Sequence, residues 1–232
     1  MFRDRKEAGE KLAREVQRLI AEDPSLAAPV VLALPRGGVP VAFEIARILD
    51  APLDLVLVRK IGVPRQPELA AAAVVDGDDP QLVLNPDVIA HAHVTDAELE
   101  AARRRELAEI ERRREMYFSG RKRTPIEGRT AIVVDDGIAT GATVRAALKA
   151  LRRRAPAALI LAVPVAANDT IDSLRSEVDQ IVCLDTPGWF RGVGAHYADF
   201  RQTGYAEVIR FLDAASDFGR GVASGAGDRT DD

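Results

Sequence analysis

The length, composition and charge of the chain are those of an ordinary globular protein. Its 232 residues, 47% hydrophobic and 29% charged, fit one α/β domain with room for an appended or inserted piece. The net charge of −4 argues against a nonspecific nucleic-acid binder, although it leaves a local basic patch open. The single cysteine, Cys183, excludes a disulfide within the chain and fits a reducing cytoplasm.

The first half of the chain predicts a helix followed by a βαβ unit. An amphipathic helix is expected at 5–20, because apolar residues recur there at helical spacing. The apolar run 29–34 ends in Pro-Arg-Gly-Gly, which indicates a buried strand entering a tight loop. A helix at 41–49 and a second strand at 53–58 complete the unit.

The middle of the chain predicts a strand pair and a long helix. Residues 70–75 and 82–84 are expected to be strands, with 76–80 as the turn between them. Thr95 and Glu98 form a capping box for a helix at 95–118. Its arginine runs alternate with glutamates, which favours a solvated helix face over a nucleic-acid contact.

The second half returns to alternating strands and helices. Strands are expected at 130–134, 158–163 and 180–184, and helices at 143–153, 170–175 and 205–214. This alternation predicts an α/β fold: a doubly wound, mainly parallel sheet with helices on both faces. We expect one domain over 1–214, a helical insertion at about 76–125, a small C-terminal hood at about 185–204, and a disordered tail at 215–232.

The apolar segments are too short for a membrane span. The longest run, 157–167, is interrupted by Pro164, and the charged N-terminus lacks the apolar core of a signal peptide. We therefore expect a cytoplasmic protein with no membrane contact.

Three loops carry the polar chemistry of the predicted sheet. They are 35–38, 59–62 and 135–143, each expected at the carboxyl end of a strand, where ligands of such sheets bind. The third loop follows an apolar strand with two adjacent carboxylates, Asp135 and Asp136.

The residues after this acid pair suit a phosphate. Gly137 and Gly141 permit unusual backbone conformations, and the N–H groups of 139–143 at a helix N-terminus form a nest for an anion. The hydroxyls of Thr140 and Thr143 add donors, while the carboxylates suit the vicinal hydroxyls of a sugar. The alternative is a plain strand–turn–helix junction with a capping aspartate, which explains one Asp and one Gly.

The run 131–143 resembles the phosphoribosyl-pyrophosphate signature of type I phosphoribosyltransferases. The resemblance implies that family's fold, with Asp135 and Asp136 on the ribose hydroxyls and 139–143 around the 5-phosphate. Loop 34–38 resembles the pyrophosphate loop, and Arg59-Lys60 resembles a basic pair near the pyrophosphate. Ala139 departs from enzymes for 6-oxopurines, which usually carry an Asp there, so a hypoxanthine-guanine assignment is in doubt.

The resemblance implies a set of site residues. The catalytic candidates are Asp135, Asp136, Arg36, Lys60 and Glu68. The substrate-binding candidates are Gly37, Gly38, Arg59, Gly137, Ile138, Ala139, Thr140, Gly141, Ala142, Thr143 and Phe190. Mg²⁺ is expected to arrive with the substrate near Asp135 and Asp136, without a firmly assigned set of protein ligands.

Two further segments are expected to complete the site. Residues 61–70 would form a mobile closing element, in which Glu68 either handles a proton on the acceptor or caps the closed loop. In the hood, Trp189 or Phe190 either stacks on a planar acceptor or closes the core.

The resemblance implies transfer of a 5-phosphoribosyl group from phosphoribosyl pyrophosphate to a nitrogenous base or similar small planar acceptor. The alternative is a non-catalytic sensor that binds the same ligand or a nucleotide and regulates nucleic acid through helix 95–118. The net charge favours the enzyme, for which we expect no nucleic-acid partner and a homodimer.

Overall fold

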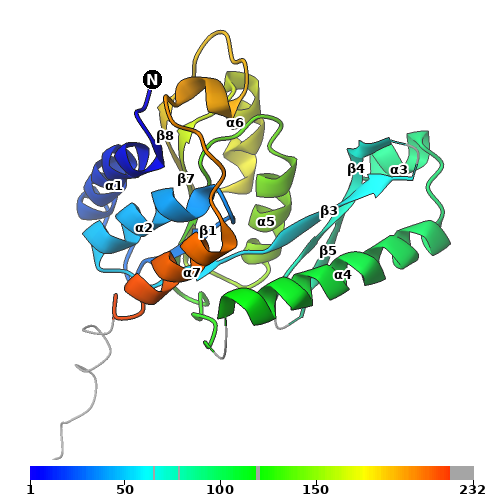
Figure 1. The fold of residues 1–232 in the computed structure, drawn as a ribbon, viewed down its shortest axis with the longest axis horizontal. Coiled ribbons are helices and arrows are strands. Elements are labelled where there is room, and N and C mark those ends of the chain that lie inside the picture. The colour runs from blue at the N-terminus through cyan, green and yellow to red at the C-terminus, as the bar shows by residue number, and fades with distance from the viewer. Residues whose placement is uncertain (65, 78, 119–120, 220–232) are drawn as a thin grey trace, which may run out of the picture.

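Two β-sheets organise the computed structural model, which describes residues 1–64, 66–77, 79–118 and 121–219 (Figure 1). The larger sheet is parallel and has the order β2-β1-β6-β7-β8. Its strands are β1 (Val30–Ala33), β2 (Leu53–Leu55), β6 (Thr130–Val134), β7 (Ala158–Val165) and β8 (Gln180–Asp185).

Helices cover both faces of this sheet. One face carries α1 (Arg5–Glu22), α2 (Gly38–Leu49) and α7 (Tyr205–Ala214), and the other carries α5 (Ala142–Arg152) and α6 (Asn168–Leu174). Two hydrophobic clusters result, because successive strand residues point to opposite faces. The prediction of a doubly wound, mainly parallel α/β fold is confirmed.

The register of β1 shows the alternation that separates the two clusters. Val31 and Ala33 belong to the cluster under α1 and α2, whereas Val30 and Leu32 belong to the cluster under α5. All four residues are buried, so the strand appears in the sequence as a continuous apolar run.

A second, antiparallel sheet forms the insertion. Its strands are β3 (Val58–Val63), β4 (Gln66–Val75) and β5 (Gln81–Leu84), followed by α3 (Pro86–His91) and α4 (Asp96–Phe118). Figure 1 shows these strands projecting away from the parallel sheet, with α4 running along them. The predicted strand pair is confirmed, as is the long helix with its capping box, in which the Thr95 N–H donates to Glu98 Oε2 at 2.9 Å.

The prediction of one strand over 53–58 and a loop over 59–62 is wrong. The chain stays beside β1 until Val56, whose N–H donates to the carbonyl of Ala33 at 2.9 Å. The next N–H, that of Leu57, donates instead to Asp76 Oδ1 at 2.8 Å, and the chain turns away into β3. A buried carboxylate 19 residues away therefore ends the second strand.

Smaller differences concern short elements. Helix α3 was not predicted, because six residues are too few to show a helical period. Two 3₁₀ turns, Arg175–Glu177 and Val193–His196, complete the fold, and the second lies in the predicted hood. Most of the predicted tail, 220–232, lies outside the described residues. Among the described helices, none combines the length and apolarity that crossing a bilayer requires.

Candidate functional site

The loop after β6 leads from the centre of the parallel sheet into α5. Gly141 has a φ of 73°, a left-handed conformation, and it precedes the first residue of α5. The loop is braced from α6, because the Thr170 hydroxyl donates to the carbonyl of Ala139 at 2.7 Å. Thr143 lies in the first turn of α5, where free backbone N–H groups and the helix dipole favour an anion.

The acid pair lies at the start of this loop, at the carboxyl edge of the sheet. The N–H of Asp136 donates to Asp135 Oδ1 at 2.9 Å, and the two carboxylates are close enough to repel each other. Burial raises the pKa of Asp135 well above its ordinary value, and repulsion from Asp136 adds to the rise. Burial also raises the pKa of Asp136, although the guanidinium of Arg5 opposes that rise. A hydroxyl donor or a cation beside the pair would relieve this repulsion.

The loop after β1 lies against the acid pair. Leu34 N–H donates to the carbonyl of Val134 at 2.9 Å, which keeps the two loops side by side at the same edge. The Pro35–Arg36 peptide bond is cis. A Cβ atom on Gly37 would lie 2.1 Å from Asp136 Oδ2, so this approach requires glycine. The guanidinium carbon of Arg36 lies 4.8 Å from the ring centre of Tyr205, at the start of α7.

These loops enclose a cavity of about 580 Å³. Its lining combines the two predicted loops with residues from α1 and from the segment before α7. The lining residues are Arg5, Leu34, Pro35, Arg36, Gly37, Asp135, Asp136, Thr143, Phe200, Gln202 and Thr203. The arrangement can hold an anionic group at the α5 N-terminus and hydroxyls at the carboxylates, with cationic side chains beside them.

Arg59 and Lys60, which were predicted as site residues, lie in the antiparallel sheet and do not line this cavity. Arg59 lies in β3 and pairs through Nε with Glu106 Oε2 of α4 at 2.7 Å. Lys60 lines a separate cavity of about 440 Å³ beside α5, which it shares with Thr140 and Ala142. Both were expected in a loop at the carboxyl edge of the parallel sheet. The expected loop is wrong, because both residues lie in β3 and pair with β4, but Lys60 still lies beside residues of the loop after β6.

The predicted closing element is a pair of strands over most of its length. Ile61 and Gly62 pair with residues of β4, and Val63 pairs with Gln66 across the tip. The backbone of Glu68 belongs to β4, but its side chain lies outside the described part of the structure. The prediction of a loop over 61–70 is therefore wrong, whereas the role of Glu68 stays a prediction.

The hood aromatics divide between the core and the surface. Phe190 stacks on the ring of His196, with the ring centres 5.5 Å apart, and it packs against the cluster that contains Phe2 and Tyr197. Trp189 is 80% exposed. The described cavity lining contains neither Phe190 nor Trp189.

Two side chains that bind Asp136 were not predicted as functional residues. Arg5, the first residue of α1, donates through Nε to Asp136 Oδ2 at 2.8 Å. The hydroxyl of Tyr197 donates to the backbone carbonyl of Asp136 at 2.6 Å. No local pattern marks Arg5, because it lies in a charged N-terminal run typical of a helix start. Tyr197 lies among the hood aromatics, a weak signal for a residue near a ligand.

Comparisons with known proteins identify the family of the chain. A family model described as "Phosphoribosyl transferase domain" matches residues 4–198. Two relatives from Mycobacterium tuberculosis, strains CDC 1551 and H37Rv, both named "Putative phosphoribosyl transferase", are each 47% identical over 215 residues. The match covers 93% of this chain and 47% of each relative, so the chain spans about half their length.

A solved structure supports the fold over nearly the whole chain. The crystal structure of TT1426 from Thermus thermophilus is similar with a TM-score of 0.78 and 40% sequence identity. The similarity covers 91% of this chain and 97% of that one, so it extends beyond the parallel sheet.

Proposed function

The chain belongs to the phosphoribosyl transferase family, and from this premise we propose that it transfers a 5-phosphoribosyl group from phosphoribosyl pyrophosphate to a nitrogenous acceptor. Pyrophosphate would be released. The observation that carries the proposal is the 580 Å³ cavity, because the acid pair, the start of α5 and loop 34–37 all line it.

Each part of the cavity suits one part of this substrate. The N-terminus of α5 with Thr143 would bind the 5-phosphate through backbone N–H groups, a hydroxyl and the helix dipole. Asp135 and Asp136 would accept hydrogen bonds from the ribose hydroxyls. The backbone of loop 35–38 and the guanidinium of Arg36 would face the pyrophosphate, where negative charge develops as the leaving group departs.

Catalysis in this proposal is mainly positioning and charge stabilisation. The bond between the anomeric carbon and the pyrophosphate oxygen breaks, and a nitrogen of the acceptor attacks from the opposite face. The chain would hold the substrate at its 5-phosphate, its ribose hydroxyls and its pyrophosphate. The anomeric carbon would then stay in line with the attacking nitrogen and the leaving oxygen.

The residues present fit a magnesium ion that arrives with the substrate. Two adjacent, largely buried carboxylates line the cavity, while the described residues contain no cluster of three metal-ligating side chains. This donor set suits an ion that keeps waters and phosphate oxygens as ligands. Bound there, Mg²⁺ would neutralise charge on the pyrophosphate.

The residue at position 139 bears on the class of acceptor. Ala139 offers no carboxylate for a 6-oxopurine, so we favour an acceptor whose proton is handled elsewhere. We retain Glu68 as a candidate for that proton, and Lys60 and Arg59 as candidates on the pyrophosphate side. All three lie on the antiparallel sheet, so they would reach the substrate through movement of that sheet. A stacking role for Phe190 would require it to leave His196.

We also propose that the protein is a cytoplasmic homodimer, with α4 as a contact surface. This helix buries only Ile110, Tyr117 and Phe118, and its remaining described residues are partly or fully exposed.

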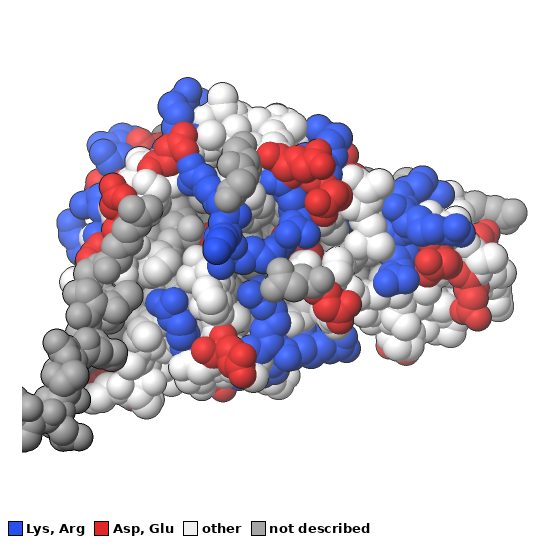
Figure 2. Space-filling view, turned by 90° about the horizontal axis from the view of Figure 1, so that it is seen from below, with Lys and Arg blue, Asp and Glu red and all other residues white. Residues whose placement is uncertain are grey.

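The surface charge gives the regulatory alternative no specific support. Figure 2 shows Lys and Arg gathered on one face, with Asp and Glu between them. On α4, Arg112 and Arg113 both bind Glu109, and Arg114 binds Glu111, so glutamates neutralise these arginines locally. A continuous basic strip for a phosphate backbone would require unpaired cations.

The test of the proposed function is the double variant Asp135→Asn with Asp136→Asn. Isothermal calorimetry with phosphoribosyl pyrophosphate and Mg²⁺ should show at least about a 100-fold loss of affinity. The reason is that two hydrogen bonds to charged groups contribute roughly 1.5–3 kcal/mol each. Asp172→Asn, on the exposed face of α6, is the matched control and should bind normally. Unchanged affinity in the double variant would reject the site assignment.

A second measurement separates an enzyme from a binding protein. Pyrophosphate release from phosphoribosyl pyrophosphate should depend on one member of a panel of nitrogenous bases. Tight binding with no release for any base would favour the sensor.

A further inference from the structure

A guanidinium from the first helix closes the ribose side of the cavity. Arg5 places Nε at 2.8 Å and Nη2 at 2.7 Å from the same oxygen, Asp136 Oδ2. The side chains of Arg5 and Asp136 are only 10% and 13% exposed. We propose that Arg5 is a positioning residue that fixes Asp136 through Oδ2, so that Oδ1 is presented to a sugar hydroxyl. This inference rests on the proposed function, because it requires a ribose at the acid pair.

The Oδ2 atom is enclosed on its other side as well. It lies 2.1 Å from the place where a Cβ atom of Gly37 would stand, whereas Oδ1 lies 3.0 Å from that point, so loop 34–37 approaches Oδ2 more closely than Oδ1. An oxygen that accepts a charge-assisted hydrogen bond from Nε, forms an ion pair with Nη2 at 2.7 Å and is approached by backbone has little room for a ligand. The second oxygen of Asp136 is the one left for the substrate.

The same guanidinium also binds the hood. Its third nitrogen, Nη1, donates to the carbonyl of Arg201 at 2.7 Å, and its central carbon lies 4.0 Å from the ring centre of Phe200. All three nitrogens of Arg5 are thus engaged, two on the acid and one on the segment before α7. Arg5 therefore couples the orientation of Asp136 to the position of residues 200–201.

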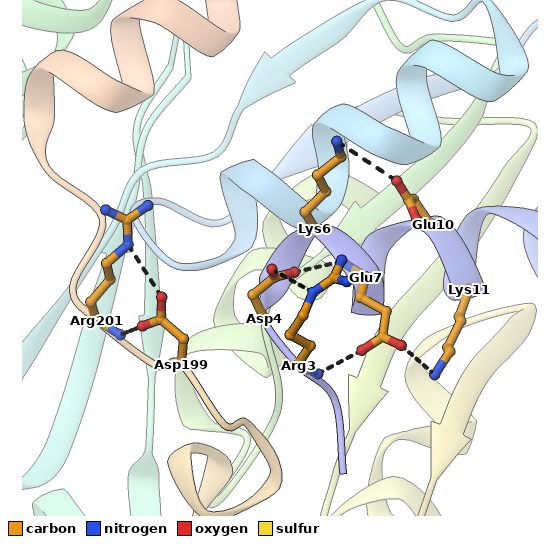
Figure 3. Close-up of polar contacts among 8 residues, drawn as sticks. All are labelled: Arg3, Asp4, Lys6, Glu7, Glu10, Lys11, Asp199 and Arg201. Carbon is orange, nitrogen blue, oxygen red and sulfur yellow. Dashed lines mark hydrogen bonds and ion pairs between the residues drawn. The ribbon is translucent and has the colours of Figure 1, made fainter.

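Arg5 is the first residue of α1, and Figure 3 shows polar contacts of its neighbours that brace this helix start. Asp4 caps α1 by accepting the N–H of Glu7 at 2.8 Å, and Glu7 accepts the N–H of Arg3 at 2.6 Å. The N–H of Asp199 donates to the carbonyl of Arg3 at 2.8 Å, which ties the hood to the same turn. These contacts fix the backbone from which the Arg5 side chain reaches Asp136, as a positioning role requires.

The experiment compares sugars that differ only in one hydroxyl. Wild type, Arg5→Gln and Arg5→Lys are titrated by calorimetry with ribose 5-phosphate, its 2-deoxy and 3-deoxy analogues, and inorganic pyrophosphate. Wild type should prefer ribose 5-phosphate over at least one deoxy analogue by about tenfold or more, since a hydrogen bond to a charged group contributes roughly 1.5–3 kcal/mol. Arg5→Gln should reduce that preference at least about fivefold and leave pyrophosphate binding unchanged. Arg5→Lys, which keeps one charged donor, should restore part of the preference.

The matched control is Arg18→Gln, a change on an exposed part of the same helix, where Arg18 pairs with Glu15 and Glu22. It should bind every ligand as wild type does. Far-UV circular dichroism and the retained affinity for pyrophosphate establish that Arg5→Gln is folded. If Arg5→Gln does not fold, the proposal is tested with Arg5→Lys alone. That variant should also show a smaller preference than wild type for ribose 5-phosphate over the deoxy analogue.

The possible failures are distinguishable. A wild type that binds ribose 5-phosphate and both deoxy analogues equally contradicts the proposed function at the acid pair. A wild type that discriminates, with Arg5→Gln discriminating equally well, overturns the inference about Arg5 and leaves the proposed function standing. A uniform loss for all sugars and pyrophosphate also overturns it, because Arg5 would then act as a general anion binder.

Discussion

At the scale of single residues, the site depends on contacts between two loops that are far apart in the sequence. Gly37 and Asp136 approach so closely that a methyl group would not fit between them. Arg36, one residue earlier, is thereby fixed at the rim of the cavity, over the ring of Tyr205. Its charge is available to a ligand group that reaches loop 34–37.

This position of Arg36 predicts that its removal weakens the binding of pyrophosphate more than that of a nucleoside monophosphate. Arg36→Ala should weaken the binding of pyrophosphate by about tenfold or more, because a charged hydrogen bond contributes roughly 1.5–3 kcal/mol. The binding of a nucleoside monophosphate should change much less, since in the proposed site its single phosphate would bind at the α5 N-terminus. Competition calorimetry measures both, and Arg175→Ala, which removes an exposed side chain just after α6, is the control. Equal weakening of both ligands would remove Arg36 from the pyrophosphate role.

The sequence predicts those site residues that stand directly after an apolar strand. Asp135, Asp136, Arg36 and Thr143 all line one cavity, as the carboxyl-edge argument requires. Arg5 could not be found in this way, because its partner is 131 positions away and its neighbours form an ordinary charged helix start. A contact of that kind is decided by the packing of α1, not by any local pattern.

At the scale of elements, the antiparallel sheet is the part of the fold whose strands were predicted least accurately from the sequence. The run 58–63 contains Arg, Lys and Gly, so it lacks the alternation typical of a half-buried strand. Pairing with the apolar β4 makes it a strand nonetheless, with irregular register on both sides of Gly62. Strand β4 was predicted from 70 onward, where its alanines and valines begin.

Helix α4 carries a buried hydroxyl that its packing does not satisfy. The ring of Tyr117 is 1% exposed, and within the described structure its hydroxyl has no hydrogen-bond partner. Burial raises the pKa of Tyr117 to about 12. Tyr117→Phe should therefore raise the free energy of unfolding, by about 1 kcal/mol, since it removes a desolvated polar group. Urea denaturation measures the change.

Tyr197→Phe is the matched control, for which the free energy of unfolding should change in the opposite direction. It removes a hydroxyl that donates to the carbonyl of Asp136 at 2.6 Å, so it should lower the free energy of unfolding by about 1 kcal/mol. Equal effects of the two substitutions would contradict this account of Tyr117.

At the scale of the whole molecule, buried carboxylates join the two sheets. Asp54, in β2, accepts the N–H of Leu55 and that of Thr124, both at 2.7 Å, and so ties the parallel sheet to the segment after α4. Asp76, at the end of β4, accepts the N–H of Leu57 and pairs with Arg123. Burial raises the pKa of both acids. The junction is polar, and each of its two acids meets backbone N–H groups or the Arg123 guanidinium within the interior.

Because both acids are buried at this junction, removing one of them should lower the free energy of unfolding substantially. Asp54→Ala leaves two backbone N–H groups without their acceptor, so the free energy of unfolding at neutral pH should fall by about 1–3 kcal/mol. Asp172→Ala, an exposed acid on α6, should change it by less than about 0.5 kcal/mol. Chemical denaturation followed by circular dichroism compares the two. A small effect of Asp54→Ala would mean that water replaces the lost acceptor at the junction.

The contacts of Arg5 also bear on how the domain matures during synthesis. The helix that carries it leaves the ribosome before the rest of the domain, whereas Arg201, which binds the same guanidinium, follows 196 residues after it. A nascent chain that stops after β8 holds all five parallel strands but none of the hood contacts to Arg5. On the proposed function, ligand affinity should arise late in synthesis, and phosphoribosyl pyrophosphate would stabilise the finished domain in preference to its precursors.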